Sequence, residues 1–82
     1  MDLYQFNFQN YENREALVWQ YGSFICFREE DDFRIVLYHM GSFFAEVWYH
    51  VPDNQIELVR GFKSRKALEP YLVTVDLSDL ER

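Results

Sequence analysis

The sequence predicts an α+β fold, in which a five- to six-stranded antiparallel β-meander is followed by one short C-terminal helix. Three observations lead to this prediction. Apolar and polar residues alternate with a period of two over most of the chain, as in half-buried strands. Turn-forming residues interrupt the alternation at short intervals. After Ser64 the apolar period becomes helical.

The first part of the chain, residues 1–13, is expected to form an N-terminal arm or an edge strand. Aromatic and polar side chains alternate in this segment, as in a short strand. Residues 10–13 resemble a turn, and residues 16–21 are rich in the aromatic and β-branched side chains typical of strands. Gly22 and Ser23 fit a two-residue hairpin loop after that strand.

The expected meander covers residues 14–63. Four adjacent carboxylates at residues 29–32 are expected to form a solvent-exposed turn without a bound cation, because they lack the ligand spacing and interior glycine of a calcium loop. Proline, aspartate and asparagine at residues 52–54 indicate another turn. The remaining strands are expected at residues 24–28, 33–38, 43–51 and 56–62.

Residues 64–82 are expected to form the helix and a C-terminal tail. Ser64 can cap a helix N-terminus. Apolar residues then fall on one helical face, namely Ala67, Leu68, Tyr71 and Leu72. Pro70 lacks a backbone donor, so the helix is expected to be short, bent or broken there. Residues 73–75 are expected to be extended, and residues 76–80 could add one final turn.

Size and composition restrict the class of protein. A chain of 82 residues makes one small domain, and its 49% of hydrophobic residues argues against a disordered acidic tail. The net charge of −6 disfavours duplex nucleic acid and anionic membranes as partners. The start of the chain lacks the features of a signal peptide, and the single Cys26 excludes an internal disulfide framework. These features predict a soluble, cytoplasmic protein.

Turn chemistry predicts the register of three strands. If residues 39–41 form a three-residue loop with the glycine in the left-handed position, Arg34 faces Glu46 on the next strand. If residues 52–54 form a similar loop ending in a left-handed asparagine, Glu46 faces Arg60. The resulting row of charges could hold an anion or an aromatic ligand, or it could be a structural ion ladder inside an interface.

This register places the candidate interaction surface on one face of the sheet. Both faces are rich in apolar side chains, and one short helix about 10 Å wide cannot cover both. The uncovered face is expected to meet a partner or a ligand. Its candidate interaction residues are Arg34, Tyr38, Phe44, Glu46, Trp48, His50, Leu58, Arg60 and Phe62. Ala45 opposite Gly61 leaves a shallow spot where a helix could approach closely.

No catalytic or metal site is expected. Glu46 and His50 are about 13 Å apart along a strand and His39 lies in a turn, so these three do not make a compact ligand set. Cys26 lies in the middle of a strand, as expected of a buried and unreactive thiol. No catalytic triad, glycine-rich phosphate loop or pair of catalytic carboxylates can be assembled. We therefore expect neither enzyme activity nor a cofactor.

One basic cluster, made of Arg60, Lys63, Arg65 and Lys66, flanks Phe62 near the expected helix start. A β-meander with one helix resembles, at the level of architecture, the single-strand-binding fold of the Whirly proteins. That resemblance implies base stacking on sheet aromatics and phosphate contacts from basic residues. The acidic overall charge argues against nucleic acid here.

The leading hypothesis is a non-catalytic protein-interaction module that forms a homodimer through the uncovered sheet face. Aromatic side chains dominate such contacts, so Trp48, Phe44, Tyr38 and Leu58 are expected near the centre of the interface. An unidentified protein partner would use the same face, and no membrane partner is expected. The alternatives are single-stranded nucleic-acid binding through the sheet aromatics and residues 60–66, and small-ligand binding between sheet and helix.

Overall fold

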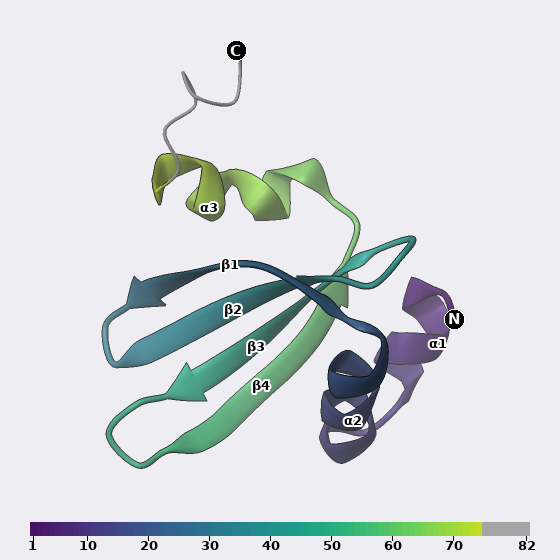
Figure 1. Ribbon diagram of the computed structural model, residues 1–82, viewed down its shortest axis with the longest axis horizontal. Coiled ribbons are helices and arrows are strands. Elements are labelled where there is room, and N and C mark those ends of the chain that lie inside the picture. Colours follow the sequence, from purple (N-terminus) through teal and green to yellow (C-terminus); the bar gives the residue numbers. More distant parts are fainter. Residues whose placement is uncertain (75–82) are drawn as a thin grey trace.

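In the computed structural model, the protein has an α+β fold with a four-stranded antiparallel sheet in the order β1-β2-β3-β4 (Figure 1). The structure describes the backbone of residues 1–74 and the side chains of residues 1–71. Its elements are α1 (Leu3–Phe8), α2 (Tyr11–Tyr21), β1 (Ser23–Glu30), β2 (Phe33–His39), β3 (Phe44–His50), β4 (Gln55–Phe62), the 3-10 turn η1 (Arg65–Leu68) and α3 (Glu69–Thr74). The α+β class and the antiparallel meander are confirmed. The meander has four strands rather than five or six, and two helices precede it.

Helices pack against both faces of the sheet. α1 and α2 lie together against one face, here called the N-terminal face, and η1 and α3 lie across the opposite, C-terminal face (Figure 1). The core cluster on the N-terminal face consists of Phe6, Val18, Met40, Phe43, Ala45, Val47 and Val59. The cluster on the C-terminal face consists of Ile35, Leu37, Phe62 and Tyr71. The expectation that one whole face lacks a covering helix is therefore wrong.

The expected N-terminal arm or edge strand is instead helix α1. Asp2 caps it, because its side chain accepts a hydrogen bond from the backbone N–H of Gln5 while the Gln5 side chain accepts one from the backbone of Asp2. On a helix, the alternating aromatic side chains point in different directions. Phe6 is buried, whereas Tyr4 and Phe8 stack on each other at the surface. Alternation over five residues therefore did not distinguish a strand from a helix.

The strand expected at residues 16–21 is also helical, since it lies in α2. Asn10 caps this helix by accepting a hydrogen bond from the backbone N–H of Asn13. The segment expected to be a turn is thus the start of a helix. Gly22 ends the helix with its N–H donated to the carbonyl of Val18, so it does not form a hairpin loop.

α1 sits at the shallow spot formed by Ala45 and Gly61, which are paired across β3 and β4 as expected. A Cβ atom on Gly61 would lie 2.9 Å from the ring of Phe6, so the close approach requires glycine. Asn7 exchanges two hydrogen bonds with the Gly61 backbone. Arg14 of α2 donates to the carbonyls of Val59 and Asn7, which ties both helices to the edge strand β4.

The connection between β2 and β3 overturns part of the predicted register. Gly41 has the expected left-handed conformation, with φ of 100°. His39 pairs with Phe44, however, so the loop contains four residues rather than three. Relative to the predicted pairing, β2 is shifted by three residues along β3. A shift by an odd number of residues exchanges the two faces of β2 relative to β3. Arg34 consequently pairs with Tyr49, and Leu37 pairs with Glu46.

The connection between β3 and β4 also has four residues, because His50 pairs with Gln55. Asn54 is left-handed as expected, with φ of 59°. A β-bulge then leaves Glu57 without a residue opposite it, since Tyr49 pairs with Ile56 and Trp48 with Leu58. The bulge cancels the extra loop residue. The predicted pairing of Glu46 with Arg60 is therefore confirmed, although the predicted loop length is wrong.

The acidic run at residues 29–32 is exposed, as expected. Its glutamates end β1, and the two aspartates form the turn, with Asp31 left-handed at φ of 54°.

Beyond the sheet, Ser64 caps the C-terminal segment by accepting a hydrogen bond from the N–H of Lys66. The segment changes from the 3-10 turn η1 to α3 just before Pro70, where a missing backbone donor is tolerated. Val73 and Thr74 continue α3 and are not extended. The turn expected at residues 76–80 lies outside the described residues.

Candidate functional site

The residues of the predicted interaction surface separate onto the two faces of the sheet. Strand pairing places Phe44, Glu46, Trp48, His50, Leu58, Arg60 and Phe62 together on the C-terminal face. Arg34 and Tyr38 lie on the N-terminal face, because they pair with Tyr49 and Ala45. The predicted row of Arg34, Glu46 and Arg60 does not form.

Glu46 is the centre of a buried polar network on the C-terminal face. Its side chain is fully buried, which is rare for a carboxylate without partners. One carboxylate oxygen accepts hydrogen bonds from Arg60 Nε at 2.5 Å and Trp48 Nε1 at 3.1 Å. The other accepts a bond of 2.6 Å from the hydroxyl of Tyr71 in α3. The network therefore joins two neighbouring strands to the helix that covers them.

Arg28 of β1, rather than the predicted Arg34, lies close to the carboxylate of Glu46. Its side chain is only 10% exposed, and Nη2 lies 4.0 Å from Glu46 Oε2. The guanidinium lies between the rings of Trp48 and Tyr71, at 5.5 and 5.1 Å from their centroids. No sequence signal identified Arg28, because its position depends on how β1 pairs with β2.

Tyr71 acts as a neutral hydrogen-bond donor in this network. Burial raises the pKa of its hydroxyl, and the hydrogen bond to Glu46 raises it further. Both oxygens of Glu46 are already engaged, and α3 covers them. The network therefore fastens α3 to the sheet, whereas the ion ladder expected between Arg34, Glu46 and Arg60 does not form.

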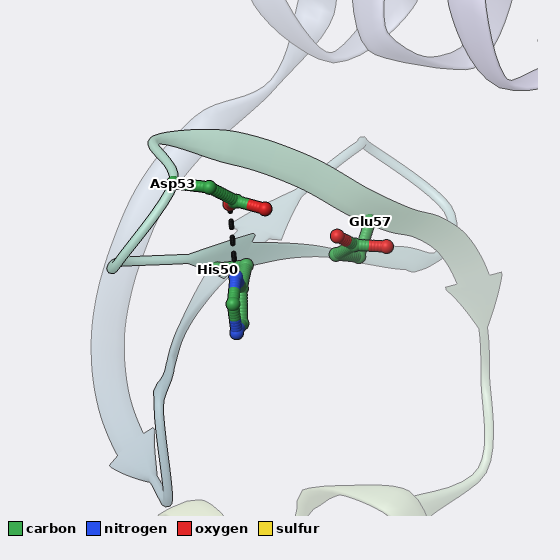
Figure 2. Close-up of side chains that lie close together, drawn as sticks. All are labelled: His50, Asp53 and Glu57. Carbon is green, nitrogen blue, oxygen red and sulfur yellow. Dashed lines mark hydrogen bonds and ion pairs between the residues drawn. The ribbon is translucent and has the colours of Figure 1, made fainter.

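A second polar cluster lies at the β3–β4 hairpin. His50 ends β3, Asp53 lies in the loop and Glu57 stands in the bulge of β4 (Figure 2). His50 Nδ1 and Asp53 Oδ1 are 2.8 Å apart. This hydrogen bond is the main cause of a raised pKa of His50. One ligand atom from each of the three residues lies within 4.8 Å of the other two, and no other such set of three occurs among the described residues.

The other candidate residues are dispersed. His39 packs its ring against Phe44 at 5.6 Å and does not join the hairpin cluster. Cys26 is half-buried, and burial raises the pKa of its thiol, which disfavours the reactive thiolate. Within the basic cluster, Arg60 pairs with Glu46, while Lys63, Arg65 and Lys66 are exposed.

Large aromatic side chains are exposed on the N-terminal face beside β1. Trp19 of α2 and Phe24 of β1 both contact the ring of Tyr38, at 5.8 and 6.3 Å. Phe27 pairs with Val36 on the same face, and the Arg34 guanidinium lies over its ring at 5.2 Å. We call Trp19, Phe24, Phe27, Arg34 and Tyr38 together the aromatic surface. The sequence pointed to exposed sheet aromatics, but on the other face and without Trp19, Phe24 or Phe27.

No protein-family model matches the chain, and neither a curated protein nor a solved structure resembles it significantly. In the part of the chain that the structure describes, no helix is long and apolar enough to cross a membrane.

Proposed function

We propose that this protein is a non-catalytic protein-interaction module that forms a homodimer through the aromatic surface. The observation that carries the proposal is the exposure of three large side chains of β1 and α2 on the N-terminal side of the sheet: Phe24 is 61% exposed, Trp19 54% and Phe27 49%. Trp, Tyr and Arg are the residues most enriched among the strong contacts of protein interfaces. The aromatic surface contains all three.

The size of the aromatic surface suits an interface. At ~150–250 Å² per aromatic side chain, of which 49–61% is exposed here, the three rings present roughly 250–400 Å² of apolar area. The largest apolar patch on a typical monomer is of this size, ~300–600 Å², and such a patch is often a functional surface. A standard interface buries ~800 Å² on each partner, so a polar rim would supply the remainder.

The charges beside the aromatic surface favour a second copy of the chain as the partner. Arg34 pairs with Glu29 across β1 and β2, so each copy offers one cation and one anion next to Phe27. In a two-fold arrangement the same patch meets itself, and the arginine of one copy can meet the glutamate of the other. The bulge between Phe24 and Cys26 makes β1 irregular, which disfavours extension of the sheet through this edge. Packing of face on face is the better arrangement.

Sedimentation of the wild type and two matched variants tests the dimer. Phe24→Glu would place a charge inside the interface and is expected to abolish association. Phe8→Glu is the control, since Phe8 is 79% exposed on α1 and lies outside the aromatic surface. Trp48→Glu is unsuitable, because Trp48 donates a hydrogen bond to the buried Glu46.

A concentration-dependent dimer that Phe24→Glu removes and Phe8→Glu retains supports the proposal. A wild type that stays monomeric at ~100 μM refutes it, because stable interfaces have dissociation constants well below that value. Equal dissociation of both variants would also refute it, since the aromatic surface would then have no special role.

Single-stranded nucleic-acid binding is the alternative, because exposed aromatic rings can also stack with bases. Arg34 is the basic residue of the aromatic surface, whereas Arg60, which belongs to the basic cluster, is held by Glu46 on the opposite face. Quenching of Trp19 fluorescence by an oligonucleotide, reversed by salt, would support this alternative. Small-ligand binding between sheet and helix has less support, because the Glu46 network occupies that position.

A further inference from the structure

The cluster at the β3–β4 hairpin combines one imidazole with two carboxylates. His50 and Asp53 are joined by the hydrogen bond at 2.8 Å, and Glu57 completes a set whose ligand atoms all lie within 4.8 Å of one another (Figure 2). The His50 side chain is partly buried, and its ring packs against Phe33 at 5.1 Å. That contact limits where the ring can turn.

The backbone brings these three side chains together through two irregularities. The four-residue loop places Asp53 beside the end of β3, and the bulge leaves Glu57 without a residue opposite it. In a regular ladder, residues at adjacent positions point to opposite faces. The bulge changes this alternation and allows Glu57 to approach His50. Asp32 is a neighbour of this hairpin, since the backbone N–H of Val51 donates to the backbone carbonyl of Asp32.

This donor set matches the chemistry of a borderline metal ion. Zinc binds histidine nitrogen and carboxylate oxygen at ~2.0–2.2 Å, which sets tetrahedral ligands ~3.3–3.5 Å apart. The separations observed here range up to 4.8 Å, so small side-chain rotations would bring the three atoms to that spacing. Two carboxylates would neutralise the charge of a divalent ion.

We propose that His50, Asp53 and Glu57 form a binding site for a divalent metal ion of the zinc class, with solvent completing the coordination. Imidazole selects zinc and similar transition metals over calcium and magnesium, which prefer oxygen ligands alone. Three protein ligands at an accessible position resemble an open site rather than a closed structural one.

Titration of the full chain with zinc chloride, followed by calorimetry and by NMR of the histidine rings, tests the site. The wild type is expected to bind one ion with a dissociation constant below ~100 μM. Binding should move the ring signals of His50 and leave those of His39 in place. His50→Gln and Glu57→Gln should each weaken binding about tenfold or more.

Three controls separate this site from adventitious binding. His39→Gln removes the other histidine and should leave the affinity unchanged. Asp32→Asn reduces the nearby acidic charge without removing one of the three ligands, so it should have a smaller effect than Glu57→Gln. Calcium chloride at the same concentration should bind far more weakly, because it gains little from imidazole.

Circular dichroism of each variant would verify folding, so that a loss of binding can be assigned to the missing ligand. Failure of the wild type to bind zinc refutes the site. Binding that survives His50→Gln and Glu57→Gln, or that His39→Gln weakens equally, also refutes it.

Discussion

The two faces of the sheet are held to their helices by different forces. On the N-terminal face, α1 and α2 pack mainly through apolar shape, since Phe6 is fully buried against Phe43 and Gly61 permits the close approach. Hydrogen bonds from Asn7 and Arg14 to the backbone of β4 add to this packing. On the C-terminal face, α3 is fastened by a network centred on the buried carboxylate of Glu46. Apolar contacts tolerate small displacements, whereas charge-assisted hydrogen bonds require one geometry. The C-terminal helix therefore gains a defined position from few contacts.

The positions of the helices also explain which part of the N-terminal face stays exposed. α1 and α2 contact β4, the strand farthest from β1 in the sheet. The part of the N-terminal face beside β1 keeps exposed aromatic side chains as a result. On the C-terminal face, α3 contacts β1, and Arg28 is drawn inward between two aromatic rings.

The largest effect is expected from breaking the apolar packing with Phe6→Ala. The variant removes a fully buried ring and leaves a cavity, so unfolding should become easier by about 3–5 kcal/mol. Urea denaturation followed by circular dichroism measures this change. Phe8→Ala on the same helix is the control and should cost less than ~0.5 kcal/mol, because Phe8 is exposed. Similar losses in the two variants would contradict the placement of α1.

A somewhat smaller effect is expected from Glu46→Gln on the C-terminal face. The substitution keeps the shape but removes the charge that Arg60 and Arg28 face, so stability should fall by about 2–4 kcal/mol. Glu57→Gln is the matched control on the neighbouring strand, where the side chain is exposed. Equal stability of the Glu46 variant and the wild type would show that the network contributes nothing.

Tyr71→Phe sharpens the comparison by removing the hydroxyl that donates to Glu46 and almost no apolar area. Loss of the bond to a charged acceptor should cost about 1.5–3 kcal/mol. Tyr11→Phe is the control, since Tyr11 is exposed. Hydrogen exchange should show faster opening of α3 in the Tyr71 variant while α1 keeps its protection. Uniformly faster exchange would indicate that the two faces are coupled.

The smallest effect concerns pH. The hydrogen bond to Asp53 raises the pKa of His50 above its ordinary value near ~6.5. The protonated ring therefore stabilises the metal-free fold fully below the unfolded pKa, and this stabilisation is lost as pH rises through the folded pKa. NMR titration of wild type and Asp53→Asn should show a lower pKa of His50 in the variant. An unchanged pKa would mean that the pair does not persist in solution.

Local sequence patterns predicted the strands after Gly22 and several turn conformations well. The left-handed residues Gly41 and Asn54 lie where glycine and asparagine suggested. The two N-terminal helices were missed, although the Asp2 and Gln5 capping box and the Asn10 cap were readable signals. Aromatic alternation was taken as a strand pattern, but a short segment with few apolar residues fits both periods.

The residues of the candidate sites were also predicted only in part, because their positions depend on how the strands pair. Glu46 and Arg60 were paired correctly, because the bulge at Glu57 compensates the longer loop. Arg34 was placed on the wrong face, because nothing compensates the odd shift between β2 and β3. Asp53 and Glu57 could not be connected with His50 without knowing that bulge.

The sequence by itself determined the strand segments after Gly22, the positions of the turn residues Gly41 and Asn54 with positive φ, and the excess of aromatic side chains, because these depend on local sterics and on a period of two. Only the tertiary structure decided which face each strand presents, which helix covers it and which charges meet. Those outcomes depend on single-residue differences in loop length and on the bulges in β1 and β4. A shift by one residue moves every side chain of a strand to the opposite face, and no local preference is strong enough to specify it.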